Sequence, residues 1–217
     1  GFQLDLKIPE EWSAVTNGTL EDKKDTAQSS LLSFHKTRPI STYLFAFAAG
    51  DFRKISRTRD GTTISMYHKE SDTARVNSNT DKIFNLHFHA LEWLEEYTGI
   101  DYPFRKFAFV VLPSFQYSGM EHPGATYYRD SRVFLDESAT IREKLNRASL
   151  ISHETAHMWF GDLVTMEWFD QVWLKEVYAN FMADKITRPR YPKINHQLNF
   201  LLTHYPSSYS VDRTRGA

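Results

Sequence analysis

Residues 151–160 read Ile-Ser-His-Glu-Thr-Ala-His-Met-Trp-Phe, and the rest of the chain is organised around this stretch. His153 and His157 are four residues apart, so a helix places both imidazole rings on one face, about one turn apart. Two neutral imidazoles on one face can share a divalent metal ion. Glu154 follows the first histidine, and its carboxylate can reach a water molecule at such a metal. The pattern His-Glu-x-x-His therefore predicts two zinc ligands and a general base.

A third protein ligand is expected, because a catalytic zinc ion usually takes three side chains and keeps one position open. Glu176, which ends the sequence Trp-Leu-Lys-Glu at residues 173–176, is the candidate, and eighteen residues lie between it and His157. That length allows a helix end, a reversal and a second helix running back alongside. The other interpretation is a surface helix that happens to carry two histidines. The apolar residues around the motif argue against it, because a buried, unligated histidine pair beside a glutamate is costly.

Two motifs together resemble the gluzincin zinc aminopeptidases, a family that includes aminopeptidase N and leukotriene epoxide hydrolase. Residues 153–165, Trp168 and residues 173–176 are similar to the zinc signature of that family. Upstream, residues 118–122 read Ser-Gly-Met-Glu-His and resemble its Gly-Ala-Met-Glu-Asn exopeptidase motif. The resemblance covers residues 80–190 closely and residues 1–79 more loosely.

The resemblance implies one zinc centre and a hydrolytic reaction. A single Zn²⁺ ion would be bound by His153, His157 and Glu176. Glu154 would take a proton from the attacking water and return it to the leaving amine. The implied reaction is the release of N-terminal amino acids from peptides by water that the metal activates.

The exopeptidase motif implies how such an enzyme selects the end of a chain. Glu121 would bind the free α-amine of the substrate, and the backbone of Gly119 and Met120 would line the peptide. An internal peptide bond has no ammonium group to offer, so the implied substrates are peptides with a free N-terminus.

Five positions depart from the family pattern. Ser118 stands where most members have Gly, and His122 stands where they have Asn. Around the third ligand, Lys175 and Val177 replace the usual Asn and Gly, and Tyr178 replaces Phe. Because every expected metal ligand is present, these changes indicate a divergent subgroup. The His122 change affects the geometry expected at the amine site.

Composition limits the class of protein and its partners. The chain has 217 residues, of which 41% are hydrophobic and 24% charged, and this balance is ordinary for a globular protein. A net charge of −1 suggests neither a nucleic-acid nor a membrane partner. The absence of cysteine excludes disulfides and thiolate ligands, leaving His, Glu and Asp to bind a metal. No apolar run is long enough for a membrane span, and the compartment is left open.

The expected fold is α+β, with two parts. Residues 1–72 would be the last strands of an N-terminal β-domain, and residues 73–217 would be a thermolysin-like zinc peptidase domain that is incomplete at its C-terminus. Asp60-Gly61 between two extended runs predicts a hairpin, and the charged residues 21–25 are typical of a solvated loop. Strands are also expected over residues 2–8, 31–35, 43–49, 107–112, 118–121 and 132–136.

Helices are expected where apolar residues recur with helical spacing. One would start near Asn79 or Thr80 and stop at Gly99, and the helix with the two histidines would run from an N-cap at Ser138 to a stop at Gly161. Further helices are expected over residues 170–186 and 194–205. His87 is expected to be a packing or surface residue, without a role in metal binding.

Two other functions stay open at this point. One is an epoxide hydrolase of the leukotriene type, with the same zinc ligands and Glu121. The other is a non-catalytic zinc-binding or peptide-binding fragment. The family's oxyanion-stabilising tyrosine would lie beyond residue 217, because Tyr205 and Tyr209 come too early. The remaining domains of the full-length chain would then be partners of this segment.

Overall fold

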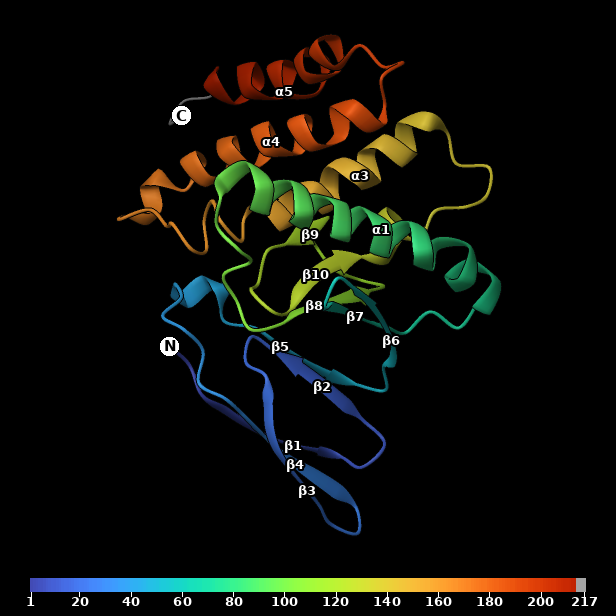
Figure 1. Ribbon diagram of the computed structural model, residues 1–217, viewed down its shortest axis with the longest axis vertical. Helices are drawn as coiled ribbons and strands as arrows, with labels where there is room; N and C mark the ends of the chain where they lie inside the picture. The colour runs from blue at the N-terminus through green and yellow to red at the C-terminus, as the bar shows by residue number, and fades with distance from the viewer. Residues whose placement is uncertain (214–217) are drawn as a thin grey trace.

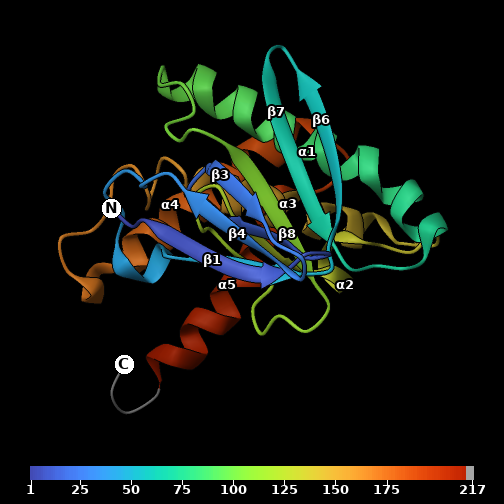
Figure 2. The same ribbon diagram turned by 90° about the horizontal axis from the view of Figure 1, so that it is seen from below.

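Strands occupy the N-terminal part of the chain in the computed structural model, which describes residues 1–213. The strands β1 (Leu4–Pro9), β4 (Ser29–Phe34) and β3 (Leu20–Asp25) form a three-stranded antiparallel sheet in that order. After the 3₁₀ turn η1 (Thr42–Leu44), β5 (Phe47–Gly50) pairs with β2 (Ser13–Thr16) in a separate sheet. These strands form the lower part of the molecule in Figure 1, and Figure 2 shows them from below.

A five-stranded mixed sheet lies between these strands and the helices (Figure 1). Its order is β6 (Arg53–Arg59), β7 (Thr62–His68), β8 (Phe107–Leu112), β10 (Thr126–Arg129) and β9 (Gly119–Met120). The central strand β8 runs parallel to both of its neighbours, and the two edge strands are antiparallel. Phe109 packs in the core on the helix side, whereas Val110 packs in the core with Val15 of β2. Both faces of β8 are therefore buried, which explains its continuous apolar sequence.

The helices form a layer on the other side of this sheet (Figure 1). They are α1 (Thr73–Thr98), the short α2 (Asp130–Val133), α3 (Ile141–Ala156), α4 (Trp173–Thr187) and α5 (His196–Asp212), with the 3₁₀ turns η2 (Phe169–Gln171) and η3 (Arg188–Arg190) on either side of α4. Ile83 of α1 and Ile151 of α3 are fully buried in one core with Ile64 of β7. This core holds α3, and with it the histidine motif, against the sheet.

Several sequence predictions are confirmed, beginning with the α+β class. Strands β1 and β8 lie where the alternating and the continuous apolar patterns predict them. Asp60 and Gly61 join β6 to β7 with φ angles of 48° and 84°, the left-handed conformation that a two-residue hairpin turn requires. Gly99 ends α1 with a φ of 66°, a C-terminal cap that glycine adopts without strain.

The charged run at residues 21–25 was predicted to be a loop, and this prediction is wrong. The segment forms most of β3, and every residue of that strand is exposed. β3 is an edge strand of the three-stranded sheet, and neither of its faces is buried, so it shows no apolar alternation. Charged side chains are common on such edges, where they discourage pairing with another chain.

The predicted starts of two helices are also wrong. The side chain of Asp72 accepts hydrogen bonds from the backbone N–H groups of Ala74 and Arg75, so α1 begins well before Asn79. Thr140, instead of Ser138, caps α3. At the other end, α3 stops at Ala156, and a turn leads to Gly161.

Two short segments adopt helical turns where strands were expected. Residues 42–44 form η1, so the strand predicted over residues 43–49 is confined to β5. Residues 130–133 form α2 in place of a strand at 132–136. Apolar content alone predicts burial in both places, but it does not distinguish a buried turn from a buried strand.

Candidate metal centre

The histidine motif lies at the C-terminal end of α3. The helix begins with a capping box, in which Thr140 accepts a hydrogen bond from the backbone N–H of Glu143 and Glu143 accepts one from that of Thr140. Its buried side chains, including Ala148 and Ile151, pack in the main core. The helical spacing then places His153 and His157 one turn apart, at the edge of the core.

The two imidazole rings are nearly perpendicular, and their Nε2 atoms lie 3.0 Å apart. The Nδ1 atom of His153 lies 3.1 Å from Oδ1 of Asn180, and that of His157 lies 3.1 Å from the carbonyl oxygen of Phe160. Both partners accept hydrogen bonds, so each Nδ1 carries the proton and each Nε2 keeps a lone pair. Two lone pairs that face each other this closely favour a cation in contact with both.

Glu176, from the first turn of α4, completes a three-residue group. Its Oε2 lies 3.3 Å from Nε2 of His153, and its Oε1 lies 3.7 Å from Nε2 of His157. The ligand atoms of the three residues all lie within 4.8 Å of one another. Bonds of about 2.05 Å at tetrahedral angles place two zinc-bound nitrogens about 3.3 Å apart. The spacing of these side chains therefore fits a zinc ion.

Asn180 is half-buried and hydrogen-bonded to His153. It lies one turn beyond Glu176 on α4, so one helix supplies both the carboxylate and the group that orients a histidine. Such outer partners fix the tautomer of a ligating imidazole. The sequence signal for this role of Asn180 is its four-residue spacing from Glu176, which places both side chains on one face of a helix.

Glu154 points into the same region from the buried side of α3. The residue is 4% exposed, and its Oε2 atom has no hydrogen-bond partner. Burial raises the pKa of Glu154 to about 8, and the nearby Glu121 and Glu176 carboxylates add to this effect. A carboxyl group with a pKa near neutrality can both accept and return a proton at working pH.

Strand β9 approaches this carboxylate closely. A Cβ atom on Gly119 would lie 2.6 Å from Cδ of Glu154, so only glycine leaves room for the side chain. Of the strand expected over residues 118–121, only Gly119 and Met120 form one, the edge strand β9, in which Met120 pairs with Tyr127 of β10. The backbone of β9 therefore forms one wall beside Glu154.

Glu121 is 3% exposed and forms an ion pair with Lys175. The Nζ atom of Lys175 also lies 3.2 Å from Oε1 of Glu176 and 4.8 Å from the centre of the Tyr43 ring. Burial alone would raise the pKa of Glu121, but the nearby His157 and Lys175 side chains outweigh it and lower the pKa below its usual value. Glu121 is thus an ionised carboxylate beside the histidine pair.

Lys175 and Tyr43 were absent from the sequence-based site. Lys175 was recognised only as a departure from the family pattern, and this departure was the signal that could have found it. Tyr43 comes from the N-terminal segment, far from either motif in the sequence. His122 contacts the N-terminal segment and β10, since its Nδ1 lies 3.1 Å from the carbonyl oxygen of Leu44 and its ring packs edge-on against Tyr127.

A second group of possible ligands shares one member with the first. Glu121, Glu154 and His157 also place one ligand atom each within 4.8 Å of the others, and all three are buried. The first group fits a metal better, because it alone contains both imidazoles, whose Nε2 atoms lie 3.0 Å apart. Glu154 and Glu121 then remain as carboxylates around the ion.

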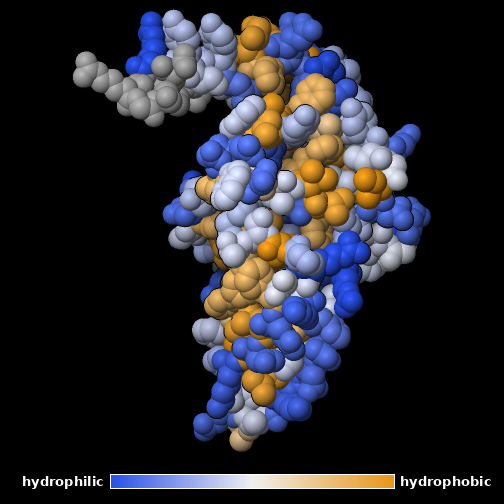
Figure 3. Space-filling view, turned by 90° about the vertical axis from the view of Figure 1, so that its left-hand side faces the viewer, coloured by the Kyte–Doolittle hydropathy of each residue, from blue (hydrophilic) through white to orange (hydrophobic). Residues whose placement is uncertain are grey.

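A cleft of about 470 Å³ opens beside His153 and Glu154. Its walls come from β9, α3, α4 and the first half of α5, and α5 contributes His196, Asn199, Phe200, Thr203 and His204. Figure 3 shows apolar residues gathered in a band along the side of the molecule that lies to the left in Figure 1. The cleft is large enough to hold several residues of an extended peptide.

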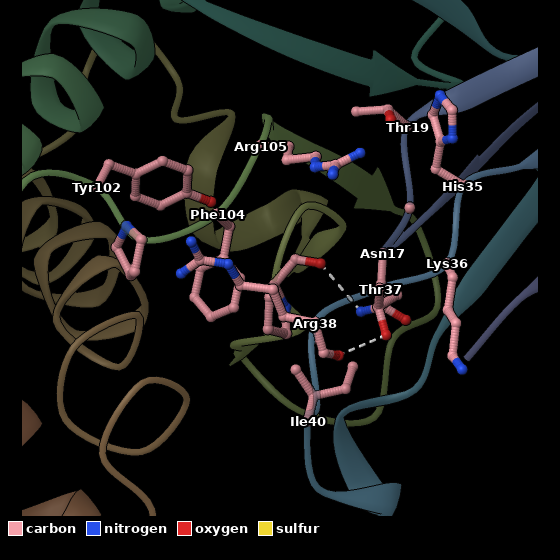
Figure 4. Close-up of a pocket in the computed structure, with 13 residues that line it drawn as sticks. Asn17, Thr19, His35, Lys36, Thr37, Arg38, Ile40, Tyr102, Phe104 and Arg105 are labelled. Carbon is pink, nitrogen blue, oxygen red and sulfur yellow. Dashed lines mark hydrogen bonds between the residues drawn. The ribbon is translucent and has the colours of Figure 1, made fainter. Parts of the chain in front are cut away.

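Another cavity, of about 340 Å³, lies between the N-terminal strands and residues 102–105 (Figure 4). Its lining contains His35, Lys36, Arg38 and Arg105 but no carboxylate. Asn17 crosses one side of it, where its Nδ2 donates a hydrogen bond to the carbonyl oxygen of Pro123 (Figure 4). None of the predicted site residues reaches this cavity.

The α+β fold and the His-Glu-x-x-His helix define the class as a metallopeptidase of the gluzincin type. The chain belongs to peptidase family M1, because the family model described as "Peptidase family M1 domain" matches residues 83–217. The family resemblance expected from the sequence is thereby confirmed. Among residues 1–213, no helix combines the length and the apolar character that crossing a membrane requires.

Relatives from distant organisms carry aminopeptidase names. "Probable aminopeptidase 2" of Sulfurisphaera tokodaii is 32% identical over 85% of this chain and 23% of its own length. Aminopeptidase N of Streptomyces lividans is 32% identical over 83% of the chain and 21% of its own length. Human endoplasmic reticulum aminopeptidase 1 is 35% identical over 83% of the chain and 19% of its own length. The chain therefore spans about a quarter or less of these relatives.

Proposed function

We propose that this segment holds the catalytic centre of a zinc-dependent aminopeptidase. The observation that carries the proposal is the convergence of His153, His157 and Glu176, with both Nε2 lone pairs directed to one point. These three residues would hold one Zn²⁺ ion, and that ion, when bound, supplies a Lewis acid that activates water and polarises a carbonyl group. The aminopeptidase names of the relatives support peptides as the substrates.

In this proposal Glu154 carries the proton. It accepts the proton of the attacking water at its free Oε2 and delivers it to the amine that leaves. Its pKa of about 8 suits both halves of this transfer, and burial keeps bulk water away from it. Gly119 allows the carboxylate to occupy its position, and the neighbouring backbone of Met120 would lie along the peptide.

Glu121 would select the end of the substrate chain. Its buried, ionised carboxylate is suited to the free α-ammonium group of a peptide. An anchor at that point fixes which peptide bond faces the metal, and it makes the enzyme an exopeptidase. Peptides with a free N-terminus are therefore the proposed substrates.

The domain division is part of the same proposal. Residues 1–72 would be the last strands of an N-terminal β-domain, and residues 73–217 would begin a thermolysin-like catalytic domain that continues beyond this segment. β7 pairs with β8, and β6 pairs with β7, so these two strands would join the catalytic sheet although they precede residue 72. The oxyanion-stabilising tyrosine and the remaining domains would be supplied by the full-length chain.

The test is Glu154→Gln in the full-length protein. The substitution preserves size but removes the proton acceptor, so zinc content should stay at one ion per chain while kcat for an L-leucyl anilide falls about 10²-fold to 10⁴-fold. Metal analysis and steady-state kinetics on the same preparation would measure both. Removing zinc with a chelator should abolish the hydrolysis, and adding zinc back should restore it.

Glu96→Gln is a matched control, because Glu96 is an exposed glutamate on α1. It should change neither the zinc content nor kcat. Full hydrolysis by Glu154→Gln would refute the assigned base, and hydrolysis of an epoxide substrate without hydrolysis of peptides would favour the epoxide hydrolase alternative. A zinc-loaded wild-type protein that cleaves neither substrate would favour a non-catalytic binding role.

A further inference from the structure

Lys175 places a primary ammonium group between two carboxylates of the proposed site. Its Nζ atom forms an ion pair with Oε1 of Glu121 and lies 3.2 Å from Oε1 of Glu176. The Tyr43 ring closes another side, with its centre 4.8 Å away. Lys175 is only 8% exposed. Two carboxylates and an aromatic face make a complete binding site for an ammonium ion.

The α-ammonium group of a peptide has the same chemistry as the Lys175 side chain. Each is a tetrahedral –NH₃⁺ group with three donors and one positive charge. Two such groups cannot contact one buried carboxylate oxygen together, because like charges repel strongly where water is largely excluded. Glu121 can therefore bind either Lys175 or the ammonium group of a substrate, but not both at once.

We propose that Lys175 is a specificity-determining residue that competes with the substrate's α-ammonium group for Glu121. This inference rests on the proposed function, in which Glu121 anchors that group. A ligand whose main contact is its ammonium group binds weakly, because it must first displace the lysine. A longer peptide gains further contacts along β9 and the cleft, and these contacts offset the displacement.

The position of Lys175 permits such an exchange. It is the third residue of α4, and its charged end lies on a flexible four-carbon side chain. The apparent affinity for an amine equals the intrinsic affinity multiplied by the fraction of time during which the Glu121 carboxylate is free. Occupation by Lys175 for nine-tenths of the time would weaken amine binding about tenfold.

A purely structural role for Lys175 predicts the opposite result. In that case the lysine holds Glu121 in place, and its removal would displace the carboxylate and weaken amine binding. The sign of the change in affinity therefore distinguishes competition from support.

The experiment measures the binding of L-leucinol by calorimetry to the zinc-loaded full-length protein. L-leucinol has a primary ammonium group but no peptide bond. Lys175→Met keeps most of the length of the side chain without its charge, and Lys175→Asn introduces the residue usual in the family. Both variants should bind L-leucinol about tenfold more tightly than the wild type. The second variant keeps the test available if the first does not fold.

Lys185→Met is the matched control, because Lys185 is on the same helix but lies over the rings of Phe181 and Tyr97. It should leave the affinity unchanged, and N-acetyl-L-leucinol should show no gain with any variant. Equal or weaker L-leucinol binding by both Lys175 variants would overturn the inference. Hydrolysis of an L-leucyl anilide by the wild type tests the proposed function separately, since its absence leaves the comparison of L-leucinol affinities intact.

Discussion

Gly119 shows how a single hydrogen atom preserves the geometry of the site. The backbone of β9 approaches the Glu154 carboxylate so closely that a methyl group would lie 2.6 Å from its Cδ atom. Glu154 has little free space around it, because it is only 4% exposed, so any shift would move its carboxylate out of position. The position therefore requires glycine because of the space available, and not because of its backbone conformation.

Gly119→Ala should reduce activity without removing the metal. The added methyl group would displace the Glu154 carboxylate by about 1 Å, and a misplacement of that size costs about 10²-fold in rate. The zinc ligands are on other elements, so the zinc content should remain at one ion per chain. Steady-state kinetics and metal analysis would measure these effects, with circular dichroism to establish that the variant is folded. A variant with unchanged kcat would contradict the proposed contact.

At the scale of single residues, the sequence predicts which side chains form the site better than it predicts which residues they contact. The spacing of His153, Glu154 and His157 follows from helical geometry, so the motif alone predicts which side chains share a face. The Glu121–Lys175 ion pair joins two residues that are 54 positions apart in the sequence. No local pattern encodes such a contact, because it depends on how the fold brings the start of α4 to the residue that follows β9.

At the scale of elements, α3 carries the two histidines, and its N-terminal cap fixes where the helix begins. Thr140 and Glu143 satisfy each other's backbone N–H groups, whereas the sequence also offers Ser138 as a cap two residues earlier. Both residues are acceptable caps by type. The choice between them depends on which one has a glutamate three residues later, and only Thr140 has Glu143 at that place.

Thr140→Ala should lower the stability of the protein by about 1 kcal/mol, the usual loss for an N-cap. Ser138→Ala is the matched control, and it should change stability little because Ser138 is exposed and lies outside the helix. Thermal unfolding of the two variants beside the wild type would measure the difference. A larger loss for Ser138→Ala than for Thr140→Ala would show that α3 begins at the earlier position.

The element boundaries that the sequence predicted incorrectly have a common physical cause. The start of α1 at Asp72 and the strand at residues 20–25 are both formed mainly by polar residues. Such segments are held by hydrogen bonds and show no apolar periodicity in the sequence. By contrast, β8 and the body of α3 were predicted well, because burial imposes a repeating apolar pattern on them.

At the scale of the whole molecule, β8 is covered on both faces, by the helices and by the N-terminal strands. The apolar sequence of residues 107–112 predicted a strand and is consistent with this double burial, but it did not show which elements supply the cover. The parallel pairing of β7 with β8 joins segments on either side of residue 72, and α1 makes the crossover. Such long-range pairing is fixed by the packed layers and not by local sequence.

His87 lies where these layers meet. Its ring stacks on Phe109 of β8 with 4.3 Å between ring centres. Its Nδ1 donates a hydrogen bond to the carbonyl oxygen of Ile83, and the hydroxyl of Tyr128 donates one to its Nε2. The expectation that His87 is a packing residue is confirmed, since its side chain is fully buried. Burial lowers the pKa of His87 to about 4.

This depressed pKa predicts a loss of stability in acid. Between pH 6.5 and 4 the unfolded chain binds a proton at His87 that the folded chain does not, so its contribution to stability is complete above pH 6.5 and disappears as the pH falls to 4. The shift corresponds to about 3 kcal/mol. Urea unfolding of the full-length protein at pH 7 and 4.5 should therefore show a smaller acid-induced loss for His87→Gln than for the wild type. The control is His35→Gln, at a half-exposed histidine on the surface, and this variant should show the same acid-induced loss of stability as the wild type. An equal loss in all three proteins would mean that His87 is not the group that resists protonation.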